Sequence, residues 1–533
     1  MKKLFTKKWK RFKTYGCKIK HLMGIPSLFK KMIENHPDLL CCELKRCVDT
    51  LYIDFNCLIH DASRNVCVTD EVIKPYDPIV QYTNYETVIQ NTIQSLRLII
   101  EKIKPVHVFI AMDGPVPKSK MMKQRERRMR KTNSYDPYSF DSNAITPGTL
   151  FMDLLSKRIH SCIHFKSFPC KHIEFSDYKC PGEGEFKIYR KIHDEKITSG
   201  MRVVYGMDAD LIVLSIASIH YKSIYLCREY ENEIQFLGIE KCLDNMKINS
   251  MKRHDFVFAL MLGGNDFVPC IEFLKIRSNG WELITQAFHD FDLPLTKNTI
   301  IWKNVLLFFK RLQLLEIENL RIQHQKIINR RHYPTDNIYD HGFFNDPTHP
   351  LHSLYGEQSM KSVVDRNDYY SFIFGNNDES FIQNACNHFV ASIQWCWEYY
   401  IHGRVLSWDY YYPYVAGPRM EDVCKYLNKS TKLISKTIPN NQHIFTPLEQ
   451  MLCVLPKTNL FLFPECVRFV LQYEYNPIDD WYVDNNILEP ITGQKMIYAN
   501  SFLPDIDTKH AVMISEICQD MMTKNEAERS ALL

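Results

Sequence analysis

In the first half of the chain, short apolar segments alternate with helical patterns, and each apolar segment is followed by an aspartate. The segments are residues 50–53 before Asp54, residues 106–111 before Asp113, and residues 201–205 before Asp208. Apolar runs of this length predict buried strands, whereas the apolar positions of residues 86–103 recur with helical spacing. Alternating strands and helices predict an α/β fold, in which helices cover both faces of a parallel sheet. Ligands of such sheets bind beyond the carboxyl ends of the strands, where these aspartates lie.

The second half of the chain has a different pattern. Residues 302–330 predict one long helix, and residues 332–380 are polar and turn-rich. An apolar, aromatic-dense stretch follows, and the chain ends in a helical tail. We therefore expect five parts. They are a basic segment (1–22), an α/β domain (23–300), a long helix with a polar linker or insertion (301–384), a second globular region (385–510) and a tail (511–533).

The charge of the chain is unevenly distributed along the sequence. The 533 residues carry a formal charge of +4, but residues 1–22 contain nine Lys or Arg and no acid. The rest of the chain has 57 basic and 62 acidic residues, so its formal charge is −5. Apolar residues make up 45% and charged residues 24%, as in globular proteins. No apolar run approaches the roughly 18–20 residues of a membrane span. Eighteen cysteines without a secretory leader predict reduced thiols in the cytosol or nucleus.

Seven acidic residues each lie at a predicted turn, and six of the chain's 18 glycines lie within three residues of them. They are Asp54, Asp113, Glu183, Glu185, Asp208, Asp210 and Asp266. In extended backbone, residues i and i+2 point to the same side. The E-x-E at 183–185 and the D-x-D at 208–210 would therefore each direct two carboxylates to one point if their turns are extended.

A single aspartate after a strand is more often a helix cap or turn former than a ligand. Seven acids in such positions exceed what capping explains. Converging carboxylates repel one another unless a cation neutralises them, and sets of oxygen ligands favour Mg²⁺ or Mn²⁺. Two such ions about 4 Å apart suit phosphodiester hydrolysis.

A strongly basic segment follows Asp113. Residues 118–131 contain eight Lys or Arg and one acid. On a helix, one face would carry Lys120, Gln124, Arg127 and Arg128. An ammonium, an amide and two guanidiniums suit a phosphate monoester. The alternatives are a solvated charged helix or a localisation signal, but the nearby acids favour a phosphate site.

A series of motifs resembles the Xrn/Rat-type 5′→3′ exoribonucleases, in the order of that family. In the first region they are MGIPSLF (23–29), LYIDFNCLIH (51–60), AMDGPVPKSKMMKQRERRMR (111–130), FDSNAITPGTLFM (140–152), CPGEGEFKI (180–188), YGMDADLIVL (205–214) and LGGNDFVP (262–269). In the second they are QWCWEYYIHGRVLSWDYYYPY (394–414), TPLEQMLCVLP (446–456) and the stretch 476–504. GEGE alone is weak, but the ordered set over residues 23–510 is specific.

The resemblance implies a nuclease core of the PIN or flap-nuclease type, buttressed by a mostly helical second region. It implies processive hydrolysis of single-stranded RNA with a 5′-monophosphate, releasing nucleoside 5′-monophosphates during RNA turnover and mRNA decay. The seven acids would bind two Mg²⁺, with Mn²⁺ able to substitute. The four residues of the basic face would bind the 5′-phosphate in a closed pocket that excludes a cap or triphosphate. We expect a monomer in the cytoplasm, or in the nucleus if residues 1–22 direct import.

The resemblance also assigns His60 to stacking on the first base. Its expected partner is Trp408 or Tyr410, because Tyr410 stands where the family has a second tryptophan. Stacking contributes about 1–3 kcal/mol per base without sequence preference. The other aromatic residues of this region are expected to be core.

Departures from the family limit what can be carried over. Residues 1–22 precede the usual start at Met23 and would be a targeting signal, an RNA-binding arm or an unused upstream start. The chain ends soon after the second region, so scaffolding roles of larger members are not expected. A zinc site at Cys162, His164, Cys170, His172 and Cys180 lacks a C-x₂-C pair, so reduced structural cysteines are expected instead.

The sequence leaves two other functions open. A flap-endonuclease-like DNA nuclease would share the acids, but its glycine-rich helix–hairpin–helix is absent from residues 267–281, which contain only Gly280. A catalytically inactive RNA-binding scaffold would be expected to have lost metal ligands, and all seven acids are present.

Overall fold

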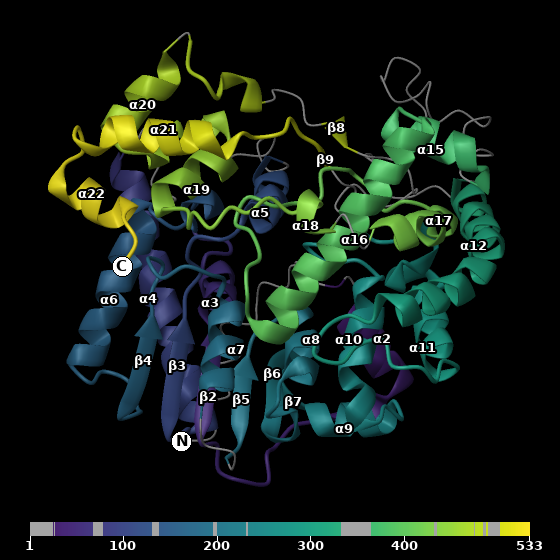
Figure 1. Cartoon of the computed structure of the whole chain (residues 1–533). Helices are drawn as coiled ribbons and strands as arrows, with labels where there is room; N and C mark the ends of the chain where they lie inside the picture. The colour runs from purple at the N-terminus through teal and green to yellow at the C-terminus, as the bar shows by residue number, and fades with distance from the viewer. Residues whose placement is uncertain are drawn as a thin grey trace.

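A seven-stranded sheet forms the centre of the first half of the chain (Figure 1). The computed structural model describes residue 25 and residues 27–67, 78–129, 138–195, 200–230, 233–331, 364–430, 434–473, 475–482, 487–488 and 501–533. The strands are β1 (Leu40–Cys41), β2 (Thr50–Asp54), β3 (His107–Ala111), β4 (His172–Ser176), β5 (Arg202–Tyr205), β6 (Ile224–Tyr230) and β7 (Glu233–Gly238). Their order is β1-β7-β6-β5-β2-β3-β4. Strands β2 to β6 are parallel, while β7 runs antiparallel to both neighbours.

Both faces of the sheet are buried, as predicted for a parallel sheet. Successive residues of a strand point to opposite faces, so Leu51 and Ile53 enter one apolar core and Tyr52 enters the other. Helices α4 (Pro78–Ile103) and α6 (Leu150–His164) pack in the first core. Helices α7 (Gly184–Asp194) and α8 (Asp210–Ala217) pack in the second. The α/β class predicted from the alternating pattern is confirmed.

Two further apolar runs, residues 211–219 and 256–262, have the length and composition of either a buried strand or a short helix, and both lie largely in helices. They are α8 and α10 (Arg253–Met261), and nearly all of their residues are buried. A helix that is buried on all sides has no polar stripe, so its periodicity does not distinguish it from a strand. The other α-helices described in this half are α2 (Leu28–Asn35), α3 (Phe55–Ala62), α5 (Lys118–Met129), α9 (Ile239–Asn245) and α11 (Trp281–His289).

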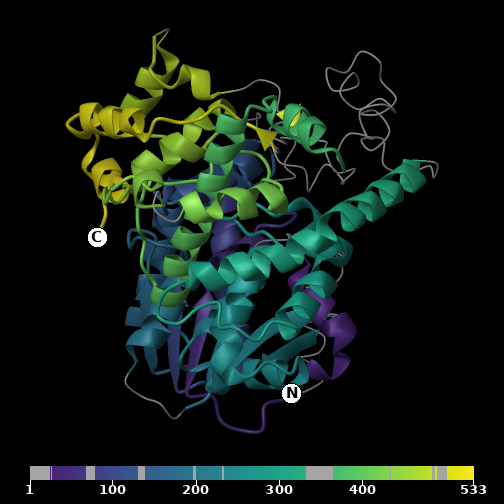
Figure 2. The same ribbon diagram turned by 45° about the vertical axis from the view of Figure 1, so that its right-hand side comes forward.

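The second half is mostly helical and covers the carboxyl ends of the strands, above the sheet in Figure 1. It contains α15 (Arg366–Phe374), α16 (Glu379–His402), α17 (Met420–Ser430), α18 (Ile434–Thr437), α19 (Pro447–Val454), α20 (Glu465–Gln472), α21 (Thr508–Gln519), α22 (Lys524–Ser530) and the short pair β8 (Ile487–Leu488) and β9 (Ser501–Phe502). The predicted long helix is present as α12 (Trp302–Arg331). Figure 2 shows its far end projecting away from the body. The basic segment 1–22 lies outside the described residues.

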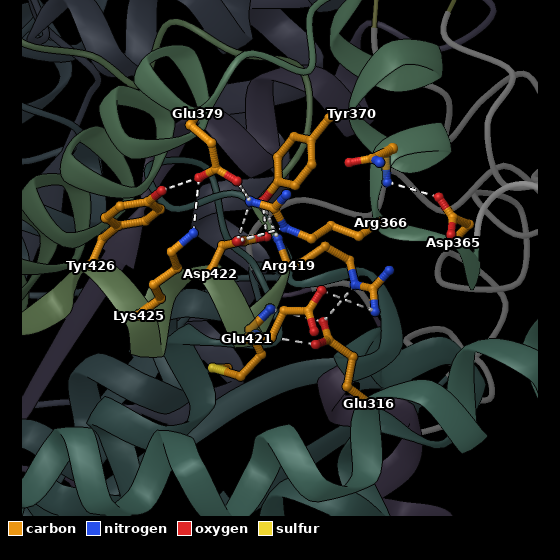
Figure 3. A network of polar contacts seen from close by, with 12 residues as sticks. Glu316, Asp365, Arg366, Tyr370, Glu379, Arg419, Glu421, Asp422, Lys425 and Tyr426 are labelled. Atoms are coloured by element: carbon orange, nitrogen blue, oxygen red, sulfur yellow. Dashed lines mark hydrogen bonds and ion pairs between the residues drawn. The ribbon is translucent and has the colours of Figure 1, made fainter.

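A buried polar network joins α12 to the second region (Figure 3). Arg419 and Glu316 are 1% and 2% exposed, and the Arg419 Nε lies 3.3 Å from Glu316 Oε1. Glu316 also accepts the backbone N–H of Met420 at 2.8 Å, at the start of α17. Beside this pair, Asp422 accepts from the Arg366 Nε at 2.8 Å and from the Tyr370 hydroxyl at 2.9 Å. These contacts hold α12, α15 and α17 together.

Membrane-spanning helices and the state of the cysteines can be read from the described part of the chain. None of its helices combines the length and apolarity needed to cross a membrane. Every cysteine within it is a free thiol.

Candidate active site

The seven acids come from the carboxyl ends of neighbouring strands, from two helix starts and from the segment after a third helix. Asp54 ends β2, Asp113 follows β3 and Asp208 follows β5. Since β5, β2 and β3 are adjacent and parallel, these three carboxylates share one edge of the sheet. The other four lie at the starts of α7 and α8 and after α10. They are Glu183, Glu185, Asp210 and Asp266. Six of the seven are at most 9% exposed, and Asp113 is half-buried.

Close backbone approach at two glycines lets these elements converge. A Cβ on Gly184 would lie 2.8 Å from Oδ1 of Asp54 and 2.9 Å from the Ala111 carbonyl oxygen. A Cβ on Gly206 would overlap a Leu211 methyl group and lie 3.2 Å from the Asp54 Cβ. Any larger residue at either position would push α7 or β5 away from Asp54.

The two acid pairs do not converge through extended turns, which was the condition set by the sequence argument. Asp210 is already the first residue of α8, and Ala209 before it is in the right-handed helical region. Glu183 is extended, but Glu185 lies within the first turn of α7. Both pairs therefore straddle a helix N-terminus. The helix-cap alternative also fails at Asp54 and Glu183, which occupy cap positions without forming a side-chain cap hydrogen bond.

Several neighbours orient the carboxylates. Asn56 donates from Nδ2 to Oδ2 of Asp113 at 2.9 Å, and the Gly184 N–H donates to Oδ1 at 2.6 Å. The Tyr399 hydroxyl, at the end of α16, donates to Glu183 at 3.2 Å. The Ile25 N–H donates to Oδ1 of Asp210 at 3.1 Å. The MGIPSLF segment thus contributes to the acidic site through its backbone.

Burial and mutual repulsion dominate the electrostatics of the cluster. Burial raises the pKa of Asp210 to about 8, with the nearby Asp266 adding to the effect. Burial likewise raises the pKa of Glu183 to about 7 and that of Asp208 to about 6, although Lys120 opposes both shifts. The pKa values of Asp54 and Glu185 are raised well above the ordinary range by burial and by neighbouring carboxylates. A cluster that resists ionisation in this way would be stabilised by added positive charge.

The chemistry of the donor set fits a divalent cation. Both carboxylate oxygens of Glu185 and Oδ2 of Asp210 are buried without a hydrogen-bond partner among the described residues. Such oxygens cost free energy unless a cation or donor meets them. Within the same residues, no group of three or more His, Cys, Asp or Glu is arranged so that it could hold a metal ion as the side chains stand. The zinc set around Cys170 is likewise not gathered into a site.

Helix α5 brings positive charge to the cluster. The Lys120 ammonium, 4% exposed, lies 2.8 Å from Oδ2 of Asp266 and forms an ion pair with Glu183. Two helical turns later, Nη2 of Arg127 lies 2.9 Å from each oxygen of Asp266. Burial alone would raise the pKa of Asp266, but Arg127 and Lys120 hold that pKa well below its usual range.

The other two residues of the predicted phosphate face have no acidic partner among the described residues. Nη2 of Arg128 donates to Oγ1 of Thr146 at 2.9 Å and to the Ile145 carbonyl at 3.4 Å. No carboxylate within the described ranges forms an ion pair with this guanidinium. Burial together with Arg127 lowers the pKa of Arg128 to about 10, although the charges of Asp113 and Asp141 oppose this shift. Gln124 accepts from Gln450 at 3.0 Å. The basic face is therefore divided. Lys120 and Arg127 form ion pairs with the acids, whereas Arg128 and Gln124 contact neutral groups nearby.

The proposed stacking residues lie in different surroundings. His60 is half-buried on α3. Trp408 is 8% exposed, packs near Phe445, and accepts the Lys118 N–H at 2.7 Å through its carbonyl. Tyr410 is 3% exposed, and its hydroxyl donates to the His388 carbonyl at 2.8 Å. Stacking on a base stays a prediction for all three.

Sequence reasoning missed three residues that hold this site. Asn56 orients Asp113 through a hydrogen bond. Because Asn56 lies only two residues after the predicted ligand Asp54, its position in the sequence could have indicated a role in the site. Tyr399 lies in the core as expected, and the sequence did not show that its hydroxyl also reaches Glu183. Gln450 contacts Gln124 from 326 positions away, and no local pattern predicts that contact.

Comparison with known proteins places these motifs in one family. The model described as "XRN 5′-3′ exonuclease N-terminus" matches residues 23–139 and 130–230, and the "Xrn1 helical domain" model matches residues 364–532. Human 5′-3′ exoribonuclease 1 is 25% identical over 95% of this chain and 35% of its own length. The protein of that name from Schizosaccharomyces pombe is 25% identical over 96% and 50%. Arabidopsis thaliana 5′-3′ exoribonuclease 2 is 24% identical over 91% and 64%.

The chain thus spans between about a third and two thirds of the length of these three relatives. The family models together match most of the chain, over both the α/β domain and the helical region. The acid cluster and α5 lie within the first matched region except for Asp266, and Gln450 lies within the second. The chain belongs to the Xrn family of 5′-3′ exoribonucleases.

Proposed function

We propose that this chain is a processive 5′→3′ exoribonuclease that hydrolyses single-stranded RNA bearing a 5′-monophosphate and releases nucleoside 5′-monophosphates. One observation carries the proposal. On a single helix, Arg127 pairs with Asp266 of the acidic cluster, while the adjacent Arg128 has no carboxylate partner among the described residues. Helix α5 therefore joins a site suited to hydrolysis with a site suited to an anion.

Arg128 and Gln124 would bind the 5′-phosphate. A terminal phosphate carries about −1.5 to −2 charges at neutral pH and presents oxygen acceptors. A guanidinium whose hydrogen-bond partners in the described part of the chain are neutral oxygens keeps its charge for such an anion. Since Arg128 follows Arg127 directly, a phosphate bound there would hold the first phosphodiester near the acids.

The seven acids would hold Mg²⁺, with Mn²⁺ able to replace it. When bound, two such ions would lower the pKa of water and offset negative charge on the reacting phosphodiester. The protein's own groups prepare the site for them. Asn56 and the Gly184 N–H orient Asp113, and Tyr399 orients Glu183. Lys120 and Arg127 limit the repulsion among the acids.

An enzyme with this specificity would act in RNA turnover after an upstream step has produced the 5′-monophosphate. A phosphate pocket without room beyond the terminal phosphate would reject capped and triphosphorylated ends. Stacking of the first base on His60 and a neighbouring aromatic ring would accept any nucleotide.

The purified chain should be tested on one RNA sequence carrying a 5′-monophosphate, a 5′-hydroxyl or a 5′-triphosphate, and on flap DNA, with Mg²⁺ or EDTA. We expect Mg²⁺-dependent release of nucleoside 5′-monophosphates, fastest from the monophosphorylated RNA. Preference for flap DNA would instead indicate a structure-specific DNA nuclease. Binding of intact RNA without hydrolysis would indicate a scaffold.

A further inference from the structure

A buried glutamine of the helical region connects the backbone before α5 to a side chain on α5. Gln450, on α19, is 0% exposed. Its Oε1 accepts the backbone N–H of Val116 at 2.8 Å, and its Nε2 donates to Oε1 of Gln124 at 3.0 Å. Two amide side chains therefore form a relay that starts at a backbone N–H and ends at the phosphate side of α5.

The first bond of this relay sets the direction of the second. A carboxamide has a donor end and an acceptor end, and the two are assigned from their partners. The backbone N–H of Val116 can only donate, so the oxygen of Gln450 must face it. The amide nitrogen of Gln450 then faces Gln124, which must present its own oxygen. The Nε2 group of Gln124 is left over as a donor, and it has no partner among the described residues.

The remaining donor suits a phosphate. Phosphate oxygens of an ionised monoester accept hydrogen bonds, so they are attracted to an amide N–H and repelled by an amide oxygen. Gln124 lies one helical turn before Arg128, on the same face of α5. Helix α5 is also anchored on either side of Gln124, because the backbone N–H of Lys118 donates to the Trp408 carbonyl at 2.7 Å and the side-chain Nη1 of Arg125 donates to the Pro504 carbonyl at 2.5 Å.

We propose that Gln450 is a positioning residue that fixes the polarity of Gln124, so that the phosphate site presents only donors. This inference rests on the proposed 5′-monophosphate specificity. Gln450 would act without touching RNA, through the single hydrogen bond to Gln124. It would favour a 5′-phosphate over a 5′-hydroxyl, which carries no anionic oxygens.

The test is Gln450→Glu, measured as the ratio of kcat/KM for 5′-monophosphorylated over 5′-hydroxyl RNA. The introduced carboxylate still accepts from Val116, but its second oxygen cannot donate when ionised. Gln124 must then turn its nitrogen toward that carboxylate and its oxygen toward the phosphate. We expect the ratio to fall about tenfold or more. Gln442→Glu, the same substitution at an exposed position of the same region, should leave the ratio unchanged.

A double-mutant cycle separates the relay from general damage. If Gln450 acts only through Gln124, then Gln450→Glu should not lower the ratio further in a Gln124→Ala background. Gln124→Glu, at a half-buried position, should lower the ratio by itself, because Gln450 would donate to one carboxylate oxygen and the other would face the phosphate. This variant keeps the test available if Gln450→Glu does not fold.

The outcomes are distinct. An unchanged ratio in folded Gln450→Glu, or an equal loss of rate on both RNA ends, would overturn the relay and leave the proposed function intact. A further fall of the ratio in the Gln124→Ala background would also overturn it. Wild-type protein that hydrolyses both RNA ends equally would overturn the proposed specificity and the relay together.

Discussion

The Nη2 atom of Arg127 lies 2.9 Å from both carboxylate oxygens of Asp266 and joins the phosphate-facing helix to the acidic cluster. Among the described residues, the next one along the helix, Arg128, donates only to neutral oxygens of Thr146 and Ile145. Adjacent arginines thus have different partners, and their substitutions should have different effects.

Arg128→Ala should lower the preference for 5′-monophosphate over 5′-hydroxyl RNA by about 10- to 100-fold. A hydrogen bond to a charged group is worth about 1.5–3 kcal/mol, and each 1.36 kcal/mol is about tenfold in rate. Arg127→Ala should also lower kcat on 5′-hydroxyl RNA, because Asp266 loses one of its two cationic partners and keeps only Lys120 among the described ion pairs. Steady-state kinetics on both RNAs measure this, with the exposed Arg321→Ala as control. Identical kinetic changes in the two variants would contradict the division of roles.

Asp208→Ala should abolish most hydrolysis while RNA binding survives. The side chain lies within the acidic cluster and makes no contact with the Gln124 and Arg128 side of α5 among the described interactions. Loss of a group that supports metal catalysis removes several kcal/mol of transition-state stabilisation, so we expect a fall of about 10³-fold. Fluorescence anisotropy with labelled RNA would measure binding, and the exposed Asp292→Ala would serve as control. A near-normal rate would refute the assignment.

Mg²⁺ should stabilise the protein more at pH 8 than at pH 6. Without metal, the folded-state pKa values of Asp210 (about 8) and Glu183 (about 7) lie above the roughly 4 of the unfolded chain. Between about pH 4 and pH 8 the folded state then holds more protons than the unfolded state, so its stability falls as pH rises. Cations that replace those protons remove this loss.

Thermal unfolding midpoints with and without Mg²⁺ measure this effect. At a concentration of about 100 times Kd, a ligand of the folded state adds about 2.7 kcal/mol. Asp210→Asn should show a smaller difference between the two pH values, because one of the titrating groups is gone. A gain from Mg²⁺ that is equal at pH 6 and pH 8 in the wild type would count against the acids as its site.

Glu316→Leu should destabilise the protein by about 3 kcal/mol, because it leaves the buried Arg419 without its main carboxylate partner. Glu318 provides a matched control on the same helix. It pairs with Arg321 at 4.0 Å with both side chains more than 60% exposed, and such surface pairs contribute less than about 1 kcal/mol. Urea unfolding of Glu316→Leu and Glu318→Leu tests the difference. Equal midpoints would show that the network in Figure 3 adds no stability.

Much of the acidic site was predictable because it depends on local patterns. Apolar runs of four to six residues predicted strands β2, β3 and β5, and in a parallel sheet the residues after such strands meet at one edge. The start of α5 after Asp113 was equally local. The geometry of the acid pairs was predicted less well, because the sequence does not show that Glu185 and Asp210 lie inside helices rather than in extended turns.

By itself, the amino-acid sequence determined the α/β class, the family and the set of acidic and basic residues near the strand ends. Only the tertiary structure decided which partners the basic side chains of α5 have. Lys120 and Arg127 form ion pairs with the acids, whereas Arg128 donates to neutral oxygens. The tertiary structure also brought Gln450 to Gln124 and Tyr399 to Glu183. The physical reason is that periodicity and spacing act over a few residues. The partner of a buried polar group, in contrast, is whichever donor or acceptor the folded chain places within about 3 Å, however distant in sequence.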